Sequence, residues 1–359
     1  MRDDCLKLTS YFGERDRTPD AFVADALLDV YERHGIATSI LLRGAVGFGR
    51  RHHLRTDRLL TLSEDLPLVS VAVDDRRRID ALLPDVLALE HRGLLTLERA
   101  RMLTGDIGPE SLPEQLHEAT KLTVYVGRQE RVYGMPAYVA VCDLLHRRDI
   151  AGATVLLGVD GTVHGRRARA RFFSRNADVP LMVIAVGDGK RVARVLPELG
   201  GLLRHPLLTL ERVRVCKRDG ELLAAPERLP GTDEHGLALW QKLMIYTSEQ
   251  ARHHDQPLHH AIIRRLREHG AIGATSLRGI WGFHGDHPPH GDRLLQLRRH
   301  VPVLTIVIDT PQHISAAFDI VDELTHERGL VTSEMVPAAH ARDRDGGHGH
   351  GLRLARPRS

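Results

Sequence analysis

The sequence has few of the features that mark secreted, membrane or zinc-binding proteins. Its 359 residues include only three cysteines, Cys5, Cys142 and Cys216, and none of them lie in a CxxC pair. Neither a disulfide framework nor a zinc knuckle is therefore indicated. No apolar run approaches the ~20 residues that span a bilayer, and the N-terminal residues lack the apolar core of a signal peptide. We expect a cytoplasmic protein that does not itself span a membrane.

Aromatic residues and net charge are also scarce. Aromatics make up 4% of the chain, so the cores must consist of leucine, valine, isoleucine and alanine. Lysine and arginine total 50 against 47 acidic residues, a formal charge of +3. That balance does not suit a protein that neutralises nucleic-acid phosphates, so we expect no nucleic-acid partner.

Patterns typical of catalysis are missing as well. The sequence contains no GxxxxGK[ST] or HExxH motif, no strand-then-GxGxxG pattern, and no recognisable pair of catalytic carboxylates. The serines Ser10 and Ser63 have no base at a familiar spacing. We therefore expect a protein that is not an enzyme and carries no cofactor.

The chain instead repeats itself three times. Each copy opens with a lysine, has glycines 37 and 40 residues later, a proline 59–60 residues later and a glutamate 90–92 residues later. In order along the chain these markers are Lys7, Gly44, Gly47, Pro67 and Glu98; Lys121, Gly158, Gly161, Pro180 and Glu211; and Lys242, Gly279, Gly282, Pro302 and Glu334. A period of this length corresponds to a whole small domain rather than to a solenoid unit.

The spacing divides the chain into three domains with two joints and a tail. The repeats are expected at 1–104, 121–218 and 242–337, joined by linkers 105–120 and 219–241, which are rich in proline, glycine and polar residues. Residues 338–359 show no apolar period and are expected to be disordered.

Each repeat reads as strand, helix, strand, strand, helix, strand. In the first copy, alternation predicts a strand at 6–12, Thr18 and Pro19 predict a helix start, and Asp74 or Asp75 is expected to cap the second helix. This order predicts an α+β fold, the ferredoxin-like βαββαβ domain repeated three times. The strands are apolar on both faces, so we expect the copies to cover one another around a pseudo-threefold axis.

Three stretches of the first copy carry a family resemblance: RGAVGFG at Arg43–Gly49, RLLTLSEDLPLVSVAVD at Arg58–Asp74 and RGLLTLERARML at Arg92–Leu103. The third copy repeats them as RGIWGFHG, DRLLQLRRHVPVLTIVID and ERGLVTSEMV, whereas the second departs with GVDGTVHG. The chain resembles the PII-like family "domain of unknown function 190", in three tandem copies. The resemblance implies a trimer fused into one chain. It also implies that an effector, typically an adenine nucleotide, binds in clefts between repeats, and that a mobile loop relays it to a partner protein such as a membrane transporter.

The glycine-rich segments are the first candidate effector site. Glycine lets backbone N–H groups approach a phosphate, which favours a ligand role for Arg43, Gly44, Gly47, Gly49, Gly158, Gly161, Arg278, Gly279 and Gly282. The alternative is that these glycines only turn the chain. On the ligand interpretation, residues 44–58 form a mobile switch and Gly47→Val leaves the fold intact.

The repeated lysines and glutamates are the second candidate. Lys7, Lys121 and Lys242 could reach an anion, or they could protect a strand edge from aggregation. Glu98, Glu211 and Glu334 could accept hydrogen bonds from adenine or ribose, or they could form structural ion pairs.

The loops after the glycines differ in charge. Residues 43–58 and 158–175 each carry five arginines and one aspartate, whereas 278–293 sum to zero and contain His284, His287 and His290. Anion binding is therefore expected where the first two loops contribute. A glycine- and proline-rich loop offers no fixed metal geometry, so no metal site is assigned.

The favoured interpretation is a regulator that binds a small anionic effector. A scaffold without a ligand and a metal-responsive protein remain as alternatives.

Overall fold

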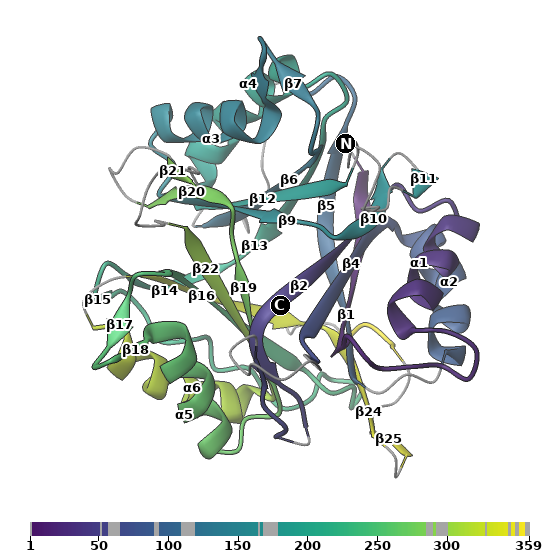
Figure 1. The fold of residues 1–359 in the computed structure, drawn as a ribbon, viewed down its shortest axis with the longest axis vertical. Coiled ribbons are helices and arrows are strands. Elements are labelled where there is room, and N and C mark those ends of the chain that lie inside the picture. Colours follow the sequence, from purple (N-terminus) through teal and green to yellow (C-terminus); the bar gives the residue numbers. More distant parts are fainter. Residues whose placement is uncertain are drawn as a thin grey trace.

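The computed structural model describes residues 2–50, 52–56, 65–89, 93–108, 119–163, 166–167, 179–284, 290–291, 301–326, 329–343, 346–348 and 352–355. Across these ranges the three repeats build a mixed α/β structure in which the strands pair antiparallel. Figure 1 shows three pairs of helices at the periphery and the strands between them.

The first repeat follows the expected order of elements with one short extra strand. Its elements are β1 (Arg2–Gly13), α1 (Val23–Arg33), β2 (Thr38–Phe48), β3 (Arg55–Thr56), β4 (Pro67–Asp75), α2 (Arg76–Ala88) and β5 (Gly93–Thr104). Asp75 caps α2 by accepting a hydrogen bond from Arg78 N, as expected. The predicted start of α1 is wrong, because Thr18 instead closes a turn with Ala21 and the helix begins at Val23.

The second and third repeats have the same four long strands and two helices. Repeat 2 contains β6 (Thr120–Gly127), β7 (Arg131–Val132), β8 (Met135–Pro136), α3 (Ala137–Arg147), β9 (Gly152–Leu157), β10 (Asp160–Val163), β11 (Arg166–Arg167), β12 (Pro180–Gly187), α4 (Gly189–Leu202), β13 (Leu207–Arg212), β14 (Arg214–Arg218) and β15 (Glu221–Leu222). Repeat 3 contains β16 (Trp240–Ser248), β17 (Arg252–His253), β18 (Gln256–Pro257), α5 (Leu258–Glu268), β19 (Ala274–Arg278), β20 (Trp281–His284), β21 (His290–Gly291), β22 (Pro302–Asp309), α6 (Pro311–Leu324) and β23 (Leu330–Val336), and the chain goes on to β24 (Ala338–Asp343) and β25 (Gly346–His348).

The long strands have one order in all three repeats. The sequence of neighbours is β2-β4-β1-β5 in repeat 1, β9-β12-β6-β13 in repeat 2 and β19-β22-β16-β23 in repeat 3. The strand that opens each repeat is therefore central, with a neighbour on both sides. Its lysine does not protect a sheet edge, so that interpretation of Lys7, Lys121 and Lys242 is wrong.

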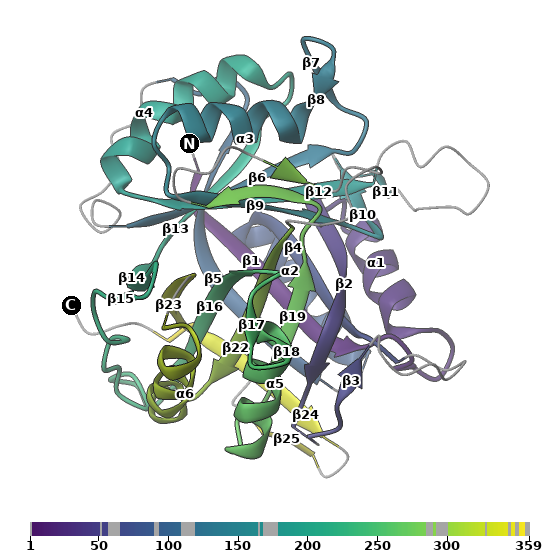
Figure 2. The ribbon, with the colours of Figure 1, turned by 60° about the vertical axis from the view of Figure 1, so that its left-hand side comes forward.

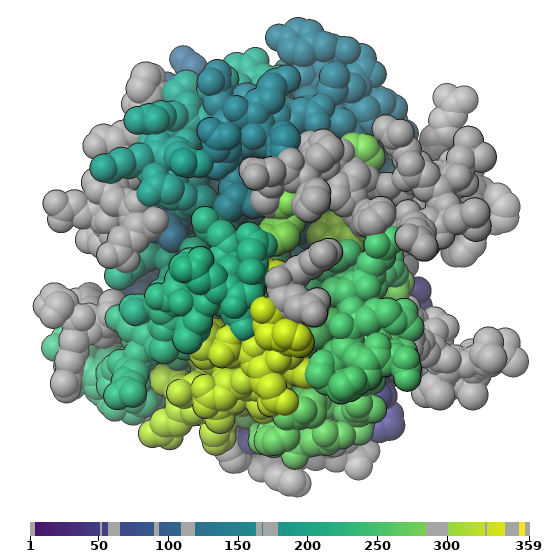
Figure 3. Space-filling view, turned by 90° about the vertical axis from the view of Figure 1, so that its left-hand side faces the viewer, coloured from purple at the N-terminus to yellow at the C-terminus, as the bar shows by residue number. Residues whose placement is uncertain are grey.

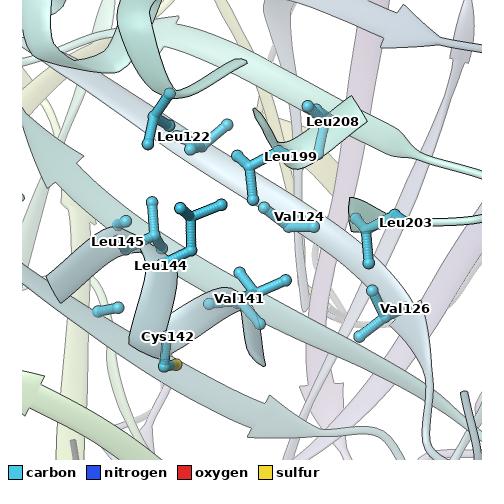
Figure 4. Packing of buried hydrophobic residues seen from close by; sticks show 14 of the residues in the cluster. Leu122, Val124, Val126, Val141, Cys142, Leu144, Leu145, Leu199, Leu203 and Leu208 are labelled. Atoms are coloured by element: carbon cyan, nitrogen blue, oxygen red, sulfur yellow. The ribbon is translucent and has the colours of Figure 1, made fainter. Parts of the chain in front are cut away.

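One face of each sheet is covered by that repeat's own helices. In repeat 2, Leu122 and Val124 of β6 pack against Val141 and Leu145 of α3 and Leu199 of α4 (Figure 4). Separate clusters of the same kind cover repeat 1 and repeat 3. Burial of these aliphatic side chains supplies the main favourable contribution to folding of each repeat.

The other face of each sheet is covered by the other two repeats. One buried cluster joins residues at matching positions of β4, β12 and β22: Val69, Val71, Met182, Ile184, Leu304 and Ile306. The sequence predicted this mutual cover from strands that are apolar on both faces. On the face drawn in Figure 3, repeat 2 in blue and teal lies above repeat 3 in green and yellow-green.

Strand pairing also links the repeats in a closed cycle. The end of β5 pairs with β13 of repeat 2, β14 pairs with β23 of repeat 3, and β24 pairs with β5 of repeat 1. A second cycle runs through β2 and β19, β10 and β2, and β20 and β9. Figure 2 shows β2 and β19 side by side. Each repeat thus pairs with both others.

The expected disorder of the tail is wrong for the part that is described. Residues Ala338–Asp343 form β24, which adds to the sheet of repeat 1, and Ala339 and Ala341 are buried there. Ala355 is buried as well, and its carbonyl oxygen accepts a hydrogen bond from Arg99 Nη2 at 3.0 Å. Alanine and backbone hydrogen bonds anchor this segment without the apolar period that a strand normally shows.

Candidate functional site: a charged ring and an inter-repeat cleft

Except for Gly49, the predicted glycines lie where a strand of one repeat meets a neighbouring repeat. A Cβ atom on Gly47 would lie 2.7 Å from the carbonyl oxygen of Ala274 in repeat 3, and one on Gly158 would lie 2.8 Å from Ile40 Cγ1 in repeat 1. A Cβ on Gly161 or Gly282 would collide with the backbone oxygen of Ser39 or Ala153. At these positions the glycines neither form a phosphate-binding loop nor serve only to turn the chain. The glycines allow strands of neighbouring repeats to approach closely.

The expectation that residues 44–58 form a mobile switch is wrong for residues 44–48. Gly44–Phe48 belong to β2 and are buried, with backbone pairs to Ala274–Leu277 of β19. His52 N then donates to Gly49 O at 2.7 Å, and β3 returns along β2. Residues 51, 57 and 58 of the expected switch lie outside the described residues. The expectation that Gly47→Val leaves the fold intact is therefore wrong, because its side chain would enter the contact between β2 and β19.

The repeated lysines and glutamates form a ring that passes through all three repeats. Each lysine contacts the glutamate of its own repeat and the glutamate of another. Lys7 contacts Glu98 and Glu211; Lys121 contacts Glu211 at 2.7 Å and Glu334; Lys242 contacts Glu334 at 3.0 Å and Glu98. We call these six residues the Lys–Glu ring. Their side chains are at most 9% exposed.

The charges of the Lys–Glu ring cancel. Three carboxylate oxygens, one from each glutamate, lie within 4.8 Å of one another, and three carboxylates at this spacing could otherwise attract a cation. The three ammonium groups already supply the balancing charge, and a metal ion among them would meet like charges at close range. The ring thus resembles a network of buried ion pairs more than a metal site.

A small cavity of about 40 Å³ adjoins the ring and is lined by Lys7, Glu98, Lys121 and Lys242 among apolar side chains. This volume holds a few water molecules and is far below the ~300 Å³ of small-molecule sites. The predicted contact between the ring and a nucleotide is not compatible with this geometry. The structure instead matches the ion-pair interpretation of the glutamates.

The ring controls the protonation of its members. Burial alone would raise the pKa of Glu98, but Lys242 and Lys7 outweigh it and lower the pKa from 4.5 to about 2. Burial likewise opposes the charged form of Lys7, yet Glu211 and Glu98 hold its pKa well above 10.5. For Lys121, burial prevails, reinforced by the neighbouring ammonium groups, and lowers the pKa.

These shifts predict a dependence of stability on pH. Because the pKa of Glu98 is lower in the folded than in the unfolded protein, its stabilisation is complete above the unfolded value of ~4.3. It is lost as the pH falls from there through about 2. We expect urea midpoints of the wild type and Glu98→Gln to differ by a constant amount between pH 5 and 8, and the difference to shrink below pH ~4. A difference that persists undiminished at pH ~2 would contradict this assignment.

The larger cavity, of about 310 Å³, lies between repeat 1 and repeat 3, and we call it the 1/3 cleft. Repeat 1 contributes apolar rings and described residues between β2 and β3, and repeat 3 contributes the start of β19 and part of β22. Its described lining is Tyr11, Phe12, Asp16, Phe48, Gly49, Arg50, His53, Arg55, Pro67, Gly93, Leu94, Ile272, Gly273, Ala274, Thr275, Ile306 and Ile308.

The polar groups that line the 1/3 cleft differ in their hydrogen bonds and in their exposure to solvent. Arg55 Nε donates to Asp65 Oδ2 at 2.9 Å, and an Arg55 terminal nitrogen lies 3.5 Å from Asp16 Oδ1. Arg50 and His53 line the same cleft and are exposed to solvent. An apolar wall with an arginine and a histidine at its rim can bind a small ligand that carries a ring and an anionic group.

Of the predicted site residues, only Gly49 lines the 1/3 cleft. Arg43 and Arg278 instead pair at equivalent surface positions with Glu14, at 2.9 Å, and Glu249, at 2.8 Å. The sequence did not identify the walls formed by Phe12, Phe48 and Ile272, because these side chains read as ordinary core residues. The useful information in the sequence was the matching residue offsets of the three copies, because they show that β2 and β19 occupy equivalent positions in their repeats.

The histidine-rich segment of repeat 3 is only partly described. His284 Nε2 lies 2.5 Å from Asp219 Oδ1, in the turn between β14 and β15, whereas His287 lies outside the described residues. Among the described residues, the one group of three potential metal ligands is that of the ring glutamates. No helix in the described ranges combines the length and apolarity needed to cross a bilayer.

Comparisons with known proteins agree with the internal repetition. The model of the family described as "Uncharacterized ACR", domain of unknown function 190, matches residues 5–102, 119–215 and 240–338. A UPF0166 protein of Aquifex aeolicus (strain VF5) is 31% identical over 94 residues, which cover 26% of this chain and 88% of the relative.

Two solved structures show only a remote likeness. An aspartate kinase from Synechocystis aligns at 11% identity and a TM-score of 0.28, covering 94% of this chain but 44% of its own. An anthrone oxidase-like protein aligns at 10% identity and a TM-score of 0.16, covering 63% of this chain and 98% of its own. Neither value carries an argument about fold. The three family matches do settle the relationship: the chain belongs to the family of domain of unknown function 190 and carries three tandem copies of its domain.

Proposed function

We propose that the chain is a PII-like regulatory protein that binds a small anionic effector, such as an adenine nucleotide, between its repeats. Each repeat would be a ferredoxin-like unit, and the three would surround a pseudo-threefold axis. The common strand order and the two closed cycles of pairing support this arrangement. The proposal is a binding and signalling role in the cytoplasm, without catalysis.

The 1/3 cleft is the observation that carries the proposal. Its volume of about 310 Å³ lies at the lower end of small-molecule sites. Phe12, Phe48 and Ile272 offer apolar surface for a base. Arg50 offers a guanidinium and His53 an imidazole for a phosphate. The site lies between two copies of the domain, as the family resemblance implies.

The effector would be relayed through the surface around the cleft. Arg50 and His53 are exposed, so a bound anion would change the charge that a partner protein meets there. Tyr11 and Ile306 line both the cleft and the cavity beside the Lys–Glu ring, so the ligand would also touch the wall that separates them. A membrane transporter is one class of partner that the family resemblance implies.

A thermal-shift panel of AMP, ADP, ATP, Mg²⁺, Mn²⁺ and Zn²⁺ tests the proposal. A ligand at a hundredfold excess over its Kd should stabilise the protein by ~2.7 kcal/mol. We expect a nucleotide to raise Tm in the wild type and in Arg147→Ala, which removes an exposed arginine of α3. The shift should be lost in the double variant Arg50→Ala, His53→Ala.

Other outcomes of the panel distinguish the alternatives. A response to a divalent metal but to no nucleotide would favour a metal-responsive protein. No response to any member of the panel would favour a scaffold that acts without a ligand. Both results would contradict the proposed effector site.

A further inference from the structure

The two other junctions between repeats contain positions equivalent to those that line the 1/3 cleft. At each of these junctions, a residue with a side chain replaces one of the glycines of the 1/3 cleft. The offsets of the repeat align Gly49 with His284, and Gly273 with Thr38. Gly49 and Gly273 both line the 1/3 cleft. A side chain therefore stands in each of the other junctions where the 1/3 cleft has only backbone.

At the junction of repeats 3 and 2, the turn between β14 and β15 contacts the corresponding residues. Asp219 Oδ1 lies 2.5 Å from His284 Nε2, and Asp219 N donates to Gly329 O at 2.8 Å. Gly329 corresponds to Gly93, which lines the open cleft. Asp219 thus contacts the residues of repeat 3 that correspond to Gly49 and Gly93 of the open cleft.

At the junction of repeats 2 and 1, hydrogen-bonded side chains fill the corresponding place. Thr38 Oγ1 donates to Thr162 O at 3.2 Å, and Thr162 Oγ1 donates to Ser39 Oγ at 3.0 Å. All three residues are buried. In the 1/3 cleft the matching residues are Gly273, Phe48 and Ala274, which make no such side-chain network.

We infer that the chain binds one effector molecule, in the 1/3 cleft alone, although it contains three copies of the domain. This inference rests on the proposed function and adds the stoichiometry and the charge class of the ligand. Arg55 is already paired with Asp65 and Asp16, so Arg50 and His53 remain to meet the ligand among the described lining. One guanidinium and one imidazole match a phosphate monoester better than a triphosphate, whose additional negative charges would meet no further unpaired cation among the described lining residues.

Isothermal titration of the full chain with AMP and with ATP tests the inference. We expect one AMP per chain, and AMP to bind at least as tightly as ATP. Three equivalent AMP sites would overturn the inference and leave the proposed function standing, as would ATP binding tenfold more tightly than AMP. Absence of saturable binding by both nucleotides would instead contradict the proposed function itself.

Gly49→His introduces into the open cleft the histidine that repeat 3 carries at the equivalent position, His284. A Cβ at Gly49 meets no atom within 4 Å, so the backbone accepts the substitution. We expect AMP affinity to fall at least tenfold while the urea midpoint stays unchanged. Gly201→His is the matched control, since Gly201 is equally open but lies on α4 away from the cleft. Unchanged AMP affinity in Gly49→His, or an equal loss in Gly201→His, would overturn the inference.

Discussion

Glu211→Gln is expected to lower the free energy of unfolding by about 3–5 kcal/mol, because it leaves an unbalanced positive charge in the centre of the molecule. Glu211 contacts Lys7 and Lys121, which belong to different repeats, and all three side chains are buried. The substitution keeps the shape of the side chain and removes only its charge. Urea unfolding followed by circular dichroism measures the effect.

Two further variants identify the cause of this loss. Glu198→Gln removes an exposed partner of Arg148 on the surface and should cost no more than about 1 kcal/mol. Adding Lys121→Met to Glu211→Gln restores neutrality in the ring and should recover part of the lost stability. If Glu211→Gln costs no more than Glu198→Gln, the ring does not contribute to stability as described.

Gly47→Val is expected to destabilise the protein by about 3 kcal/mol, because it forces a branched side chain between two strands. A Cβ at this position would lie 2.7 Å from Ala274 O and 3.2 Å from Thr275 Cα, both backbone atoms of repeat 3. Backbone atoms in a paired strand cannot move aside as the end of a flexible side chain can. The urea midpoint of the variant measures the cost.

Gly201→Ala is a control that is expected to change the stability in the opposite direction. Gly201 lies near the end of α4, and a Cβ there meets no atom within 4 Å. Alanine in a helix is favoured over glycine by roughly 0.5–1 kcal/mol, so this variant should be slightly more stable than the wild type. Equal stability of Gly47→Val and the wild type would contradict the close contact between β2 and β19.

The sequence predicted the tandem organisation and much of each repeat, because these depend on local patterns. The regular offsets of lysine, glycine, proline and glutamate located the three copies, and helical spacing located α1 and α2. The start of α1 was missed because Thr18 and Pro19 form a turn before the helix rather than its cap.

The contacts between repeats were not predictable from local patterns. A glycine that admits a neighbouring strand has the same sequence signature as one that turns the chain, so Gly47 and Gly158 were assigned to loops. The lysine–glutamate spacing was visible, but it does not reveal that Lys7 reaches Glu211 as well as Glu98. The strand at Ala338–Asp343 was missed because its burial comes from pairing with β5.

The mass of the protein in solution tests the central claim most directly, namely that one chain supplies all three repeats of the assembly. Each repeat already pairs with both others, and the Lys–Glu ring closes within a single chain. Light scattering coupled to size-exclusion chromatography should therefore give a single species of 40.1 kDa. A particle of three chains, in which each repeat pairs with its like in other chains, would contradict this account.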